Sequence, residues 1–239
     1  MTQRHFGSLR AFLYARDSSE AYLGLHLTAG ALVVTLCAFI FGHIAEDVVT
    51  MDKITMLDLQ LSQWFHSRAT PSLNRFMLLI THLHGTLGIL ALSLLLAIYW
   101  IRIKAWAWLI TLVLTVPFGM LLNVLLKHTF QRTRPTFDVP LLTLDSYSFP
   151  SGHAAGATLF YGVLAAWLIC TTRSWRWRAF IATLACLFVA LVGISRIYLG
   201  VHYLSDVLAA VAASGGWLTL SLTAVAIWCR HRRLPQIKE

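Results

Sequence analysis

Long apolar runs that recur along the chain constrain its fold more than any other feature. Six segments are predominantly apolar: 22–43, 78–101, 105–126, 153–171, 179–195 and 205–229. A helix needs about 20 such residues to cross a bilayer, so the segment 179–195 is short and requires help from its flanks. The whole chain is 58% hydrophobic and 12% charged, whereas about a quarter of the residues of a soluble domain are charged. We therefore predict an all-α polytopic membrane protein with six transmembrane helices, in which residues 1–239 form a single membrane-embedded domain.

A shorter segment between the first two apolar runs has a different pattern. Its apolar residues recur at spacings of three and four: Ile54, Leu57, Leu61, Trp64 and Phe65. Polar residues stand between them: Asp58, Gln60, Ser62 and Gln63. This spacing is typical of a helix with one apolar face. We predict an amphipathic helix over about 54–68 that lies in the membrane interface and does not span.

The basic residues are distributed unevenly between the two sides of the predicted bundle. With the N-terminus inside, twelve of the nineteen fall in inside segments: Arg4, Arg10, Arg16, Arg102, Lys104, Arg173, Arg176, Arg178, Arg230, Arg232, Arg233 and Lys238. The other seven fall outside: Lys53, Arg68, Arg75, Lys127, Arg132, Arg134 and Arg196. Loops rich in Lys and Arg stay in the cytoplasm. We therefore predict a multi-pass protein of the inner (cytoplasmic) membrane with both termini cytoplasmic, and a first apolar run that is retained as a helix.

Composition also argues against several other classes of protein. The net charge is +9, but the basic residues are scattered between apolar runs and form no stripe with interleaved aromatics, so nucleic-acid binding is not expected. Four cysteines lie inside apolar stretches without any metal-ligand spacing: Cys37, Cys170, Cys186 and Cys229. We interpret them as buried small hydrophobic residues and predict no zinc site or disulfide framework. No feature of the sequence specifies an oligomeric state.

Three polar stretches stand at the ends of predicted helices, all on the outer side. They cover Lys127 to Pro135, Pro150 to His153 and Ser195 to Asp206. The orientation was set mainly by other residues, so the shared face is independent support for a common site. Because charge is rare inside the predicted spans and gathers at helix ends, a transporter, which holds ionisable groups near the bilayer midplane, is the weaker alternative.

The residue types in these stretches suit a phosphate group. Lys127, Arg134 and Arg196 offer three cations, and the two guanidinium groups can bind phosphate oxygens in bidentate fashion. Pro150 suits the first turn of a helix, whose free N–H groups near Ser151 and Gly152 would bind an anion.

Two histidines complete a set of groups for phosphoryl transfer. His202 and Asp206 are four residues apart, and on a helix the carboxylate would orient the imidazole. Gly200 permits the turn that brings Arg196 back beside His202. His153 is suited to protonate a leaving oxygen. The site residues are thus His202, His153 and Asp206 as the catalytic group and Lys127, Arg134, Ser151, Gly152 and Arg196 as the phosphate-binding group, with no metal and no cofactor.

These stretches, spanning residues 127–206, resemble the type-2 phosphatidic acid phosphatase superfamily. The family pattern is Lys-x6-Arg-Pro, then Pro-Ser-Gly-His, then Ser-Arg-x5-His-x3-Asp, and each part stands here without departure. The resemblance implies that His202 attacks phosphorus and becomes a phosphohistidine, that Asp206 orients it and that His153 protonates the leaving group. It implies a lipid phosphate substrate. The outer face, which the distribution of basic residues predicts, favours undecaprenyl diphosphate, phosphatidylglycerol phosphate, phosphatidic acid or a lipid A phosphate.

Several alternatives stay open from the sequence. A phosphotransferase that passes the phosphoryl group to another lipid would carry the same motifs. His128 and Arg132, near the first motif, are interpreted as interfacial anchors. His82 and His84 lie near the outer start of the second apolar run. They could line the mouth of the site, but we interpret them as polar packing residues.

Overall fold

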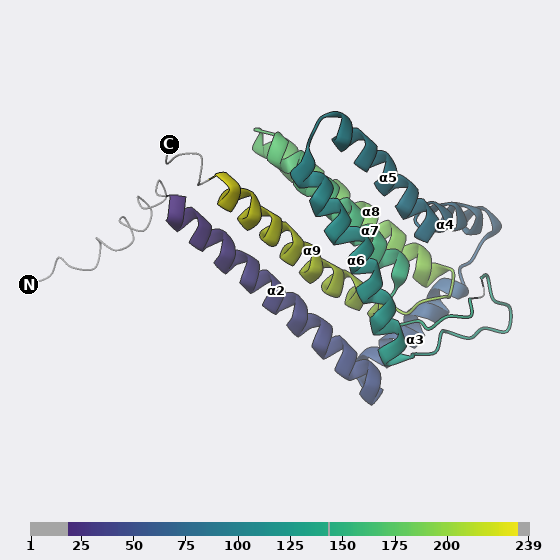
Figure 1. The fold of residues 1–239 in the computed structure, drawn as a ribbon. Coiled ribbons are helices and arrows are strands. Elements are labelled where there is room, and N and C mark those ends of the chain that lie inside the picture. The colour runs from purple at the N-terminus through teal and green to yellow at the C-terminus, as the bar shows by residue number, and fades with distance from the viewer. Residues whose placement is uncertain (1–18, 143, 234–239) are drawn as a thin grey trace, which may run out of the picture.

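The chain folds into a bundle of helices (Figure 1). The computed structural model describes residues 19–142 and 144–233, with side chains for 27–142 and 144–230. Its helices are α2 (Ser19–Thr50), α3 (Lys53–His66), α4 (Pro71–Leu83), α5 (Thr86–Arg102), α6 (Trp106–Phe130), α7 (Gly152–Thr171), α8 (Trp175–Tyr198) and α9 (Leu204–Arg233). Of the residues used to predict orientation, Arg4, Arg10, Arg16 and Lys238 lie outside the described part of the chain.

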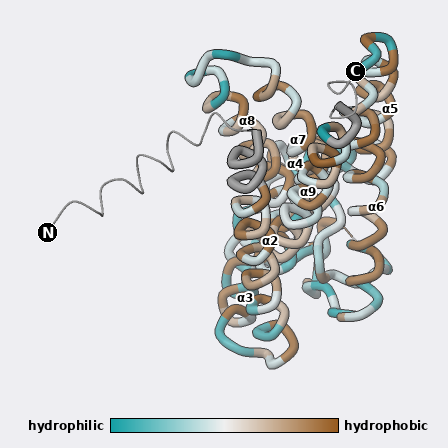
Figure 2. Tube along the Cα trace, turned by 60° about the vertical axis from the view of Figure 1, so that its left-hand side comes forward, coloured by the Kyte–Doolittle hydropathy of each residue, from teal (hydrophilic) through white to brown (hydrophobic). Residues whose placement is uncertain are grey.

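The helices account for the predicted membrane spans. Five of them are long and apolar enough to cross a bilayer by themselves: Leu27–Thr50, Trp106–Phe130, Gly152–Thr171, Trp175–Tyr198 and Leu204–Arg230. A sixth span forms if α4 and α5 are counted together. Hydrophobic residues line the length of these helices, and hydrophilic residues gather in the connections at both ends (Figure 2). The predicted all-α membrane fold is confirmed, and α8, with 24 residues, is longer than the segment 179–195 suggested.

The second apolar run is not one straight helix, as the sequence predicted. It divides into α4 and α5, which meet at a bend of 53°. The break has a local cause at Gly85 and Gly88. A Cβ at Gly88 would lie 2.0 Å from the carbonyl oxygen of Leu83, so only glycine lets the two helix ends approach so closely.

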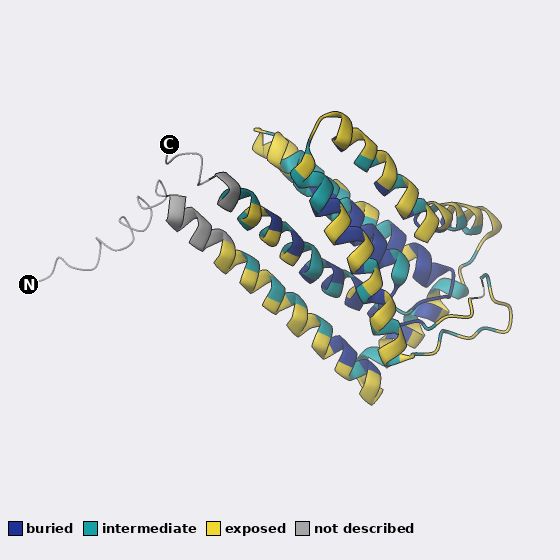
Figure 3. Cartoon of the chain, in the orientation of Figure 1, coloured by how far each residue is buried: buried dark blue, intermediate teal, exposed yellow. Residues whose placement is uncertain are grey.

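Helix α7 lies at the centre of the bundle and packs against α6, α8 and α9, as the dark colour of its ribbon shows (Figure 3). Its first turns carry the small residues Ala154, Ala155, Gly156 and Ala157, which let neighbouring helices approach closely. A Cβ at Gly162 would lie 2.3 Å from the side chain of Leu218 on α9. This close packing fixes the start of α7 relative to the ends of its neighbours.

The prediction that the four cysteines are buried is wrong. Cys170 and Cys186 are exposed, and Cys37 and Cys229 are half-buried. An apolar neighbourhood does not imply burial in a membrane protein, because the surface that faces lipid is apolar too. The predicted amphipathic helix is present as α3, but Asp58 and Ser62 on its polar side are buried. This helix therefore turns polar groups toward the protein interior.

Candidate active site

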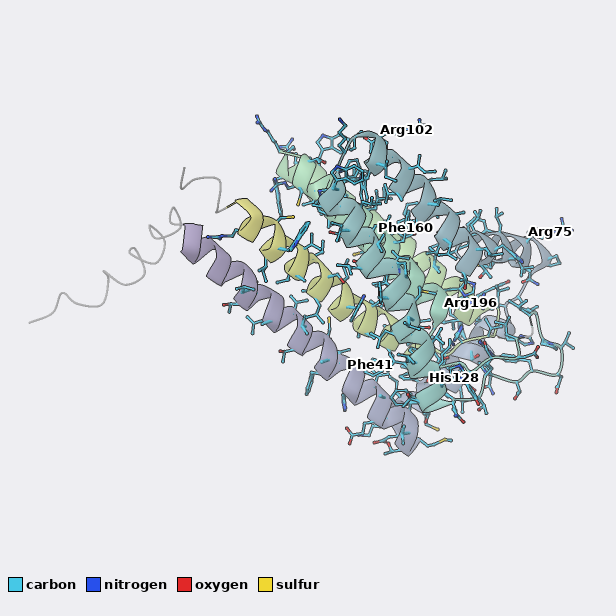
Figure 4. The ribbon with its side chains drawn as sticks, viewed as in Figure 1. Phe41, Arg75, Arg102, His128, Phe160 and Arg196 are labelled. Carbon is cyan, nitrogen blue, oxygen red and sulfur yellow. The ribbon has the colours of Figure 1, made fainter. Side chains whose placement is uncertain are left out.

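The three polar stretches meet at one end of the bundle. They occupy the end of α6 with the connection that follows it, the start of α7, and the turn between α8 and α9. Arg196 and His128 lie toward this end, whereas Arg102 lies at the opposite end (Figure 4). The structure therefore brings together all eight predicted site residues, which come from segments far apart in the sequence.

His202 and Asp206 form the centre of the cluster. The Nδ1 atom of His202 lies 3.2 Å from Oδ2 of Asp206, and the same oxygen accepts a 2.9 Å hydrogen bond from the backbone N–H of Tyr203. Both side chains are buried. The sequence placed the two residues one turn apart on a helix, but His202 precedes α9, which begins at Leu204. The contact forms because the turn at Gly200, with φ of +71°, folds His202 back over the start of α9.

The surroundings of His202 keep its imidazole neutral. Burial lowers the pKa of His202 well below its usual value, and the charges of Arg196, Arg134 and Lys127 lower it further. A neutral ring that donates from Nδ1 to Asp206 carries its lone pair on Nε2. This atom lies 3.3 Å from Nη1 of Arg134. The lone pair thus faces the cationic side of the site, where it accepts a hydrogen bond from Arg134.

Lys127 and Arg134 are held by the connection between α6 and α7. The Nζ of Lys127 donates to the carbonyl oxygen of Tyr147 at 2.6 Å. Arg134 donates to the carbonyl oxygens of Ser146 at 2.6 Å and Val201 at 2.5 Å. Burial lowers the pKa of Arg134, although Asp206 acts in the opposite direction. Two cations are thus fixed close to His202, and the groups that accept their hydrogen bonds are neutral carbonyl oxygens.

Arg196 and Ser151 carry buried donors without partners. Arg196 is 1% exposed, and its Nη1 donates to Oγ1 of Thr81 at 3.1 Å. Its Nε and Nη2 atoms have no hydrogen-bond partner, and neither has Oγ of Ser151. Buried polar groups are nearly always paired, so unpaired ones need an explanation. A guanidinium edge and a hydroxyl that lack partners are suited to an anion that brings its own oxygens.

The start of α7 adds backbone donors to the cluster. Ser151 precedes the helix and makes no side-chain capping bond, so the first N–H groups of α7 keep their capacity to bind an anion. A Cβ at Gly152 would lie 3.9 Å from Cε of Lys127, which shows how close the backbone and this cation are. Pro150, predicted in the first turn, lies before the helix, which begins at Gly152.

The bend between α4 and α5 closes the side of the site next to His153. The Nε2 atom of His153 lies 3.6 Å from the position that a Cβ would take at Gly85. His84 is buried, as polar packing requires: its Nε2 contacts Oη of Tyr161 at 2.7 Å and its Nδ1 contacts the carbonyl oxygen of Ile80 at 2.8 Å. His82 is exposed. The bend thus supplies a wall of the site that the sequence did not predict.

Arg132 is not the interfacial anchor that the sequence suggested. Its Nη1 lies 2.7 Å from Oδ1 of Asp206, and its Nη2 lies 2.9 Å from Oδ2 of Asp58. Burial alone would lower the pKa of Arg132, but Asp206 and Asp58 together raise it. Its position inside the first motif was a signal of a role in the site. Asp58 gave a weaker signal, as the single carboxylate within an otherwise uncharged stretch of the amphipathic helix.

An all-helical membrane bundle with a buried histidine, its carboxylate and a set of cations at helix ends has the architecture of a membrane phosphatase. The chain belongs to the PAP2 superfamily, whose family model matches residues 106–230. This membership places it among the membrane lipid phosphatases.

Particular relatives agree with this assignment. The chain is 34% identical over 175 residues to phosphatidylglycerophosphatase B of Bacillus subtilis, covering 71% of this chain and 84% of that protein. It is 34% identical over 114 residues to an undecaprenyl-diphosphatase of Sulfolobus acidocaldarius, covering 46% of this chain and about half (48%) of that protein. The crystal structure of a transmembrane PAP2-type phosphatidylglycerolphosphate phosphatase from Bacillus subtilis superposes with a TM-score of 0.71 and 30% identity, covering 79% of this chain and 94% of that one. Aquifex aeolicus LpxE superposes with a TM-score of 0.57 and 25% identity, covering 70% of this chain and 94% of that one.

Proposed function

We propose that this protein hydrolyses a lipid phosphate or diphosphate through a phosphohistidine intermediate on His202, without a metal ion. The observation that carries the proposal is the set of buried unpaired donors, Nε and Nη2 of Arg196 and Oγ of Ser151, in the cluster that holds the neutral His202. Such donors cost stability unless a ligand satisfies them. A phosphate group offers the required acceptor oxygens next to a nucleophilic nitrogen.

The first half of the reaction transfers the phosphoryl group to the protein. The Nε2 lone pair of His202 attacks phosphorus, a P–N bond forms, and the P–O bond to the lipid breaks. The negative charge of the bound phosphate favours the protonated form of His153, which gives its proton to the departing oxygen. Positive charge that develops on the ring of His202 is stabilised through Nδ1–H by Asp206. Lys127, Arg134 and Arg196 stabilise the negative charge of the phosphoryl oxygens in the transition state.

The second half returns the enzyme to its starting state. Water attacks phosphorus of the phosphohistidine and gives a proton to His153, which now acts as base. The P–N bond breaks, inorganic phosphate leaves, and Nε2 of His202 regains its lone pair. No electron acceptor is required, because the reaction involves only phosphoryl and proton transfer. Transfer of the phosphoryl group to a second lipid in place of water would give a phosphotransferase.

The location of the cluster at helix ends supports a lipid substrate whose headgroup lies at the membrane surface. The distribution of basic residues favours the outer face, with both termini cytoplasmic. The named relatives act on phosphatidylglycerol phosphate and undecaprenyl diphosphate, and phosphatidic acid presents a similar monoester. These three lipids are therefore the proposed substrates.

The proposal is tested with purified protein in detergent and a panel of these three lipids, together with a lipid A phosphate. Release of inorganic phosphate from at least one lipid, with no acceptor added, is the expected result. Transfer of phosphate to a second lipid without release of inorganic phosphate would identify a phosphotransferase. Movement of intact lipid across a vesicle membrane with no cleavage would identify a transporter.

Chelation of metal ions is expected to leave the activity largely unchanged. The site presents three cations where a metal-dependent phosphatase needs carboxylate and histidine ligands, and a divalent ion would be repelled by them. Phosphate release is measured with excess EDTA and after addition of Mg²⁺. Loss of activity in EDTA that Mg²⁺ restores would contradict the metal-free mechanism.

A further inference from the structure

Arg132 bridges two buried carboxylates, and only one of them touches His202. Its guanidinium group lies 2.7 Å from Asp206, which contacts Nδ1 of His202, and 2.9 Å from Asp58 on the amphipathic helix α3. Asp58 is 1% exposed and Asp206 is fully buried. The carboxylate of α3 is thus three contacts away from the proposed nucleophile, through Arg132 and Asp206.

Ser205 and Tyr203 fix this bridge in one arrangement. The backbone N–H of Ser205 donates to Oδ1 of Asp58 at 2.9 Å, and its hydroxyl group bonds to the other oxygen of the same carboxylate. Nη1 of Arg132 also donates to Oγ of Ser205 at 2.7 Å. The Cζ atom of Arg132 lies 4.3 Å from the centroid of the Tyr203 ring. The guanidinium group is therefore confined by α3, by the start of α9 and by an aromatic face.

The balance of charge in this group determines how strongly Asp206 acts on His202. A guanidinium group paired with Asp206 alone would neutralise it and weaken its attraction for a cationic imidazole. The second carboxylate, Asp58, adds a negative charge beside the guanidinium group and offsets its positive charge. The Asp58–Arg132 pair is then close to neutral, and Asp206 keeps its negative charge for the ring.

Building on the proposed function, we infer that Asp58 and Arg132 form a positioning pair, which orients Asp206 and sets the negative charge that it presents to His202. A role limited to holding α3 against α9 would depend on the same contacts. The two roles differ in one respect: a charge effect of Asp58 is reversed when Arg132 also loses its charge, whereas a packing defect is not.

The test compares Asp58→Asn with the double variant Asp58→Asn/Arg132→Gln, using the intact protein in detergent. Asparagine keeps an oxygen for the N–H of Ser205 but removes the charge, so Arg132 then neutralises Asp206. The turnover number of Asp58→Asn is expected to fall about 10–100-fold, the range for partners that orient an active-site ligand. KM should change little, since Asp58 bonds to Arg132 and Ser205, neither of which is a proposed phosphate-binding residue. The double variant is expected to be faster than Asp58→Asn.

The dependence of kcat/KM on pH provides a readout that a packing role would not move. His202 is faced by Asp206 from α9, Lys127 from α6, Arg196 from α8, His153 from α7 and Arg134 from the connection, and none of these changes in the variants. Weaker attraction from Asp206 makes protonation of His202 harder, so the acidic limb of the profile moves to lower pH in Asp58→Asn. In the double variant it returns toward its original position. Glu46→Gln, at an exposed residue of α2, is the matched control and should leave the profile unchanged.

The outcomes separate this inference from the proposed function. If the wild-type protein releases phosphate and depends on His202, but Asp58→Asn has normal turnover and an unshifted pH profile, the positioning pair is wrong and the function stands. A double variant as slow as Asp58→Asn, with unchanged helical content and thermal stability, would overturn the charge argument and leave only a packing role. Failure of the wild-type protein to cleave any lipid phosphate would refute the proposed function itself.

Discussion

Replacing His202 with alanine is expected to abolish phosphate release from lipid substrates while the helical bundle stays intact. In the proposed reaction Nε2 of His202 is the nucleophile, and the other site residues bind the phosphate, orient His202 or transfer protons. Removal of the nucleophile of a hydrolase costs about 10⁴-fold or more in turnover. Phosphate release, circular dichroism and thermal unfolding are measured on the same preparation. Near-normal turnover in His202→Ala would show that the nucleophile is wrongly assigned.

His153→Ala provides the contrast that separates the two histidines. Without its acid, the enzyme should still attack phosphorus but release a poor leaving group slowly. The loss is therefore expected to be smallest for an aryl phosphate, whose oxygen leaves without a proton, and larger for a lipid monoester. With such an aryl substrate, labelled phosphate should accumulate on His202 of the His153→Ala variant, because water then lacks its base. If turnover fell equally for the aryl phosphate and the lipid monoester, His153 would not be the general acid.

The membrane bundle could be predicted from the sequence because hydropathy is a local property. Five of the six long apolar runs form single helices close to the expected positions, and the second divides into α4 and α5. The bend between α4 and α5 could not be seen in an average over about 20 residues, because His84 and Gly85 are too few to interrupt an apolar run. The bend brings Gly88 close to the carbonyl oxygen of Leu83. This contact depends on the three-dimensional arrangement of the two helices, which hydropathy does not describe.

The candidate site, too, was only partly predictable from the sequence. The predicted residues stand at fixed short spacings, so the sequence carries both their identity and their order. Asp58 belongs to none of these stretches, and its partner Arg132 lies 74 positions further along the chain. The sequence correctly placed Asp58 among the polar residues of an amphipathic helix, but it gave no indication that the carboxylate is buried. The sequence did not reveal the ion pair between Asp58 and Arg132, because hydropathy and short motifs carry no information on contacts between distant segments.

The positive charges of the proposed phosphate-binding residues should also lower the stability of the folded protein. Arg196 is buried, two of its nitrogen atoms have no partner, and Arg134 and Lys127 place two more positive charges nearby. Buried charge without compensation destabilises a fold. Active sites commonly retain such groups because the ligand needs them, and this produces a trade-off between stability and activity. The trade-off at Arg196 can be measured.

Arg196→Met is expected to lower turnover and at the same time raise thermal stability. Methionine has a similar volume and needs no hydrogen bonds, so the free energy of unfolding should rise by about 1–4 kcal/mol, the range for apolar replacement of buried ionic groups. Turnover should fall about 10²–10³-fold, the cost of removing one donor to a transition-state anion. Arg75→Met, at an exposed arginine of α4 (Figure 4), is the control and should change neither quantity.

Binding of vanadate tests whether the unpaired donors of Arg196 form an anion-binding site. An anion that binds only the folded protein raises its free energy of unfolding, by about 2.7 kcal/mol at a concentration 100 times its Kd. The melting temperature rises with it. Vanadate should therefore stabilise the wild-type protein and Arg75→Met but not Arg196→Met, because the anion needs the unpaired Nε and Nη2 donors. Equal stabilisation of all three proteins would place the anion elsewhere. Removing one of several unpaired buried charges should raise stability. If Arg196→Met is instead less stable than the wild-type protein, Arg196 supports the fold through its hydrogen bond to Thr81.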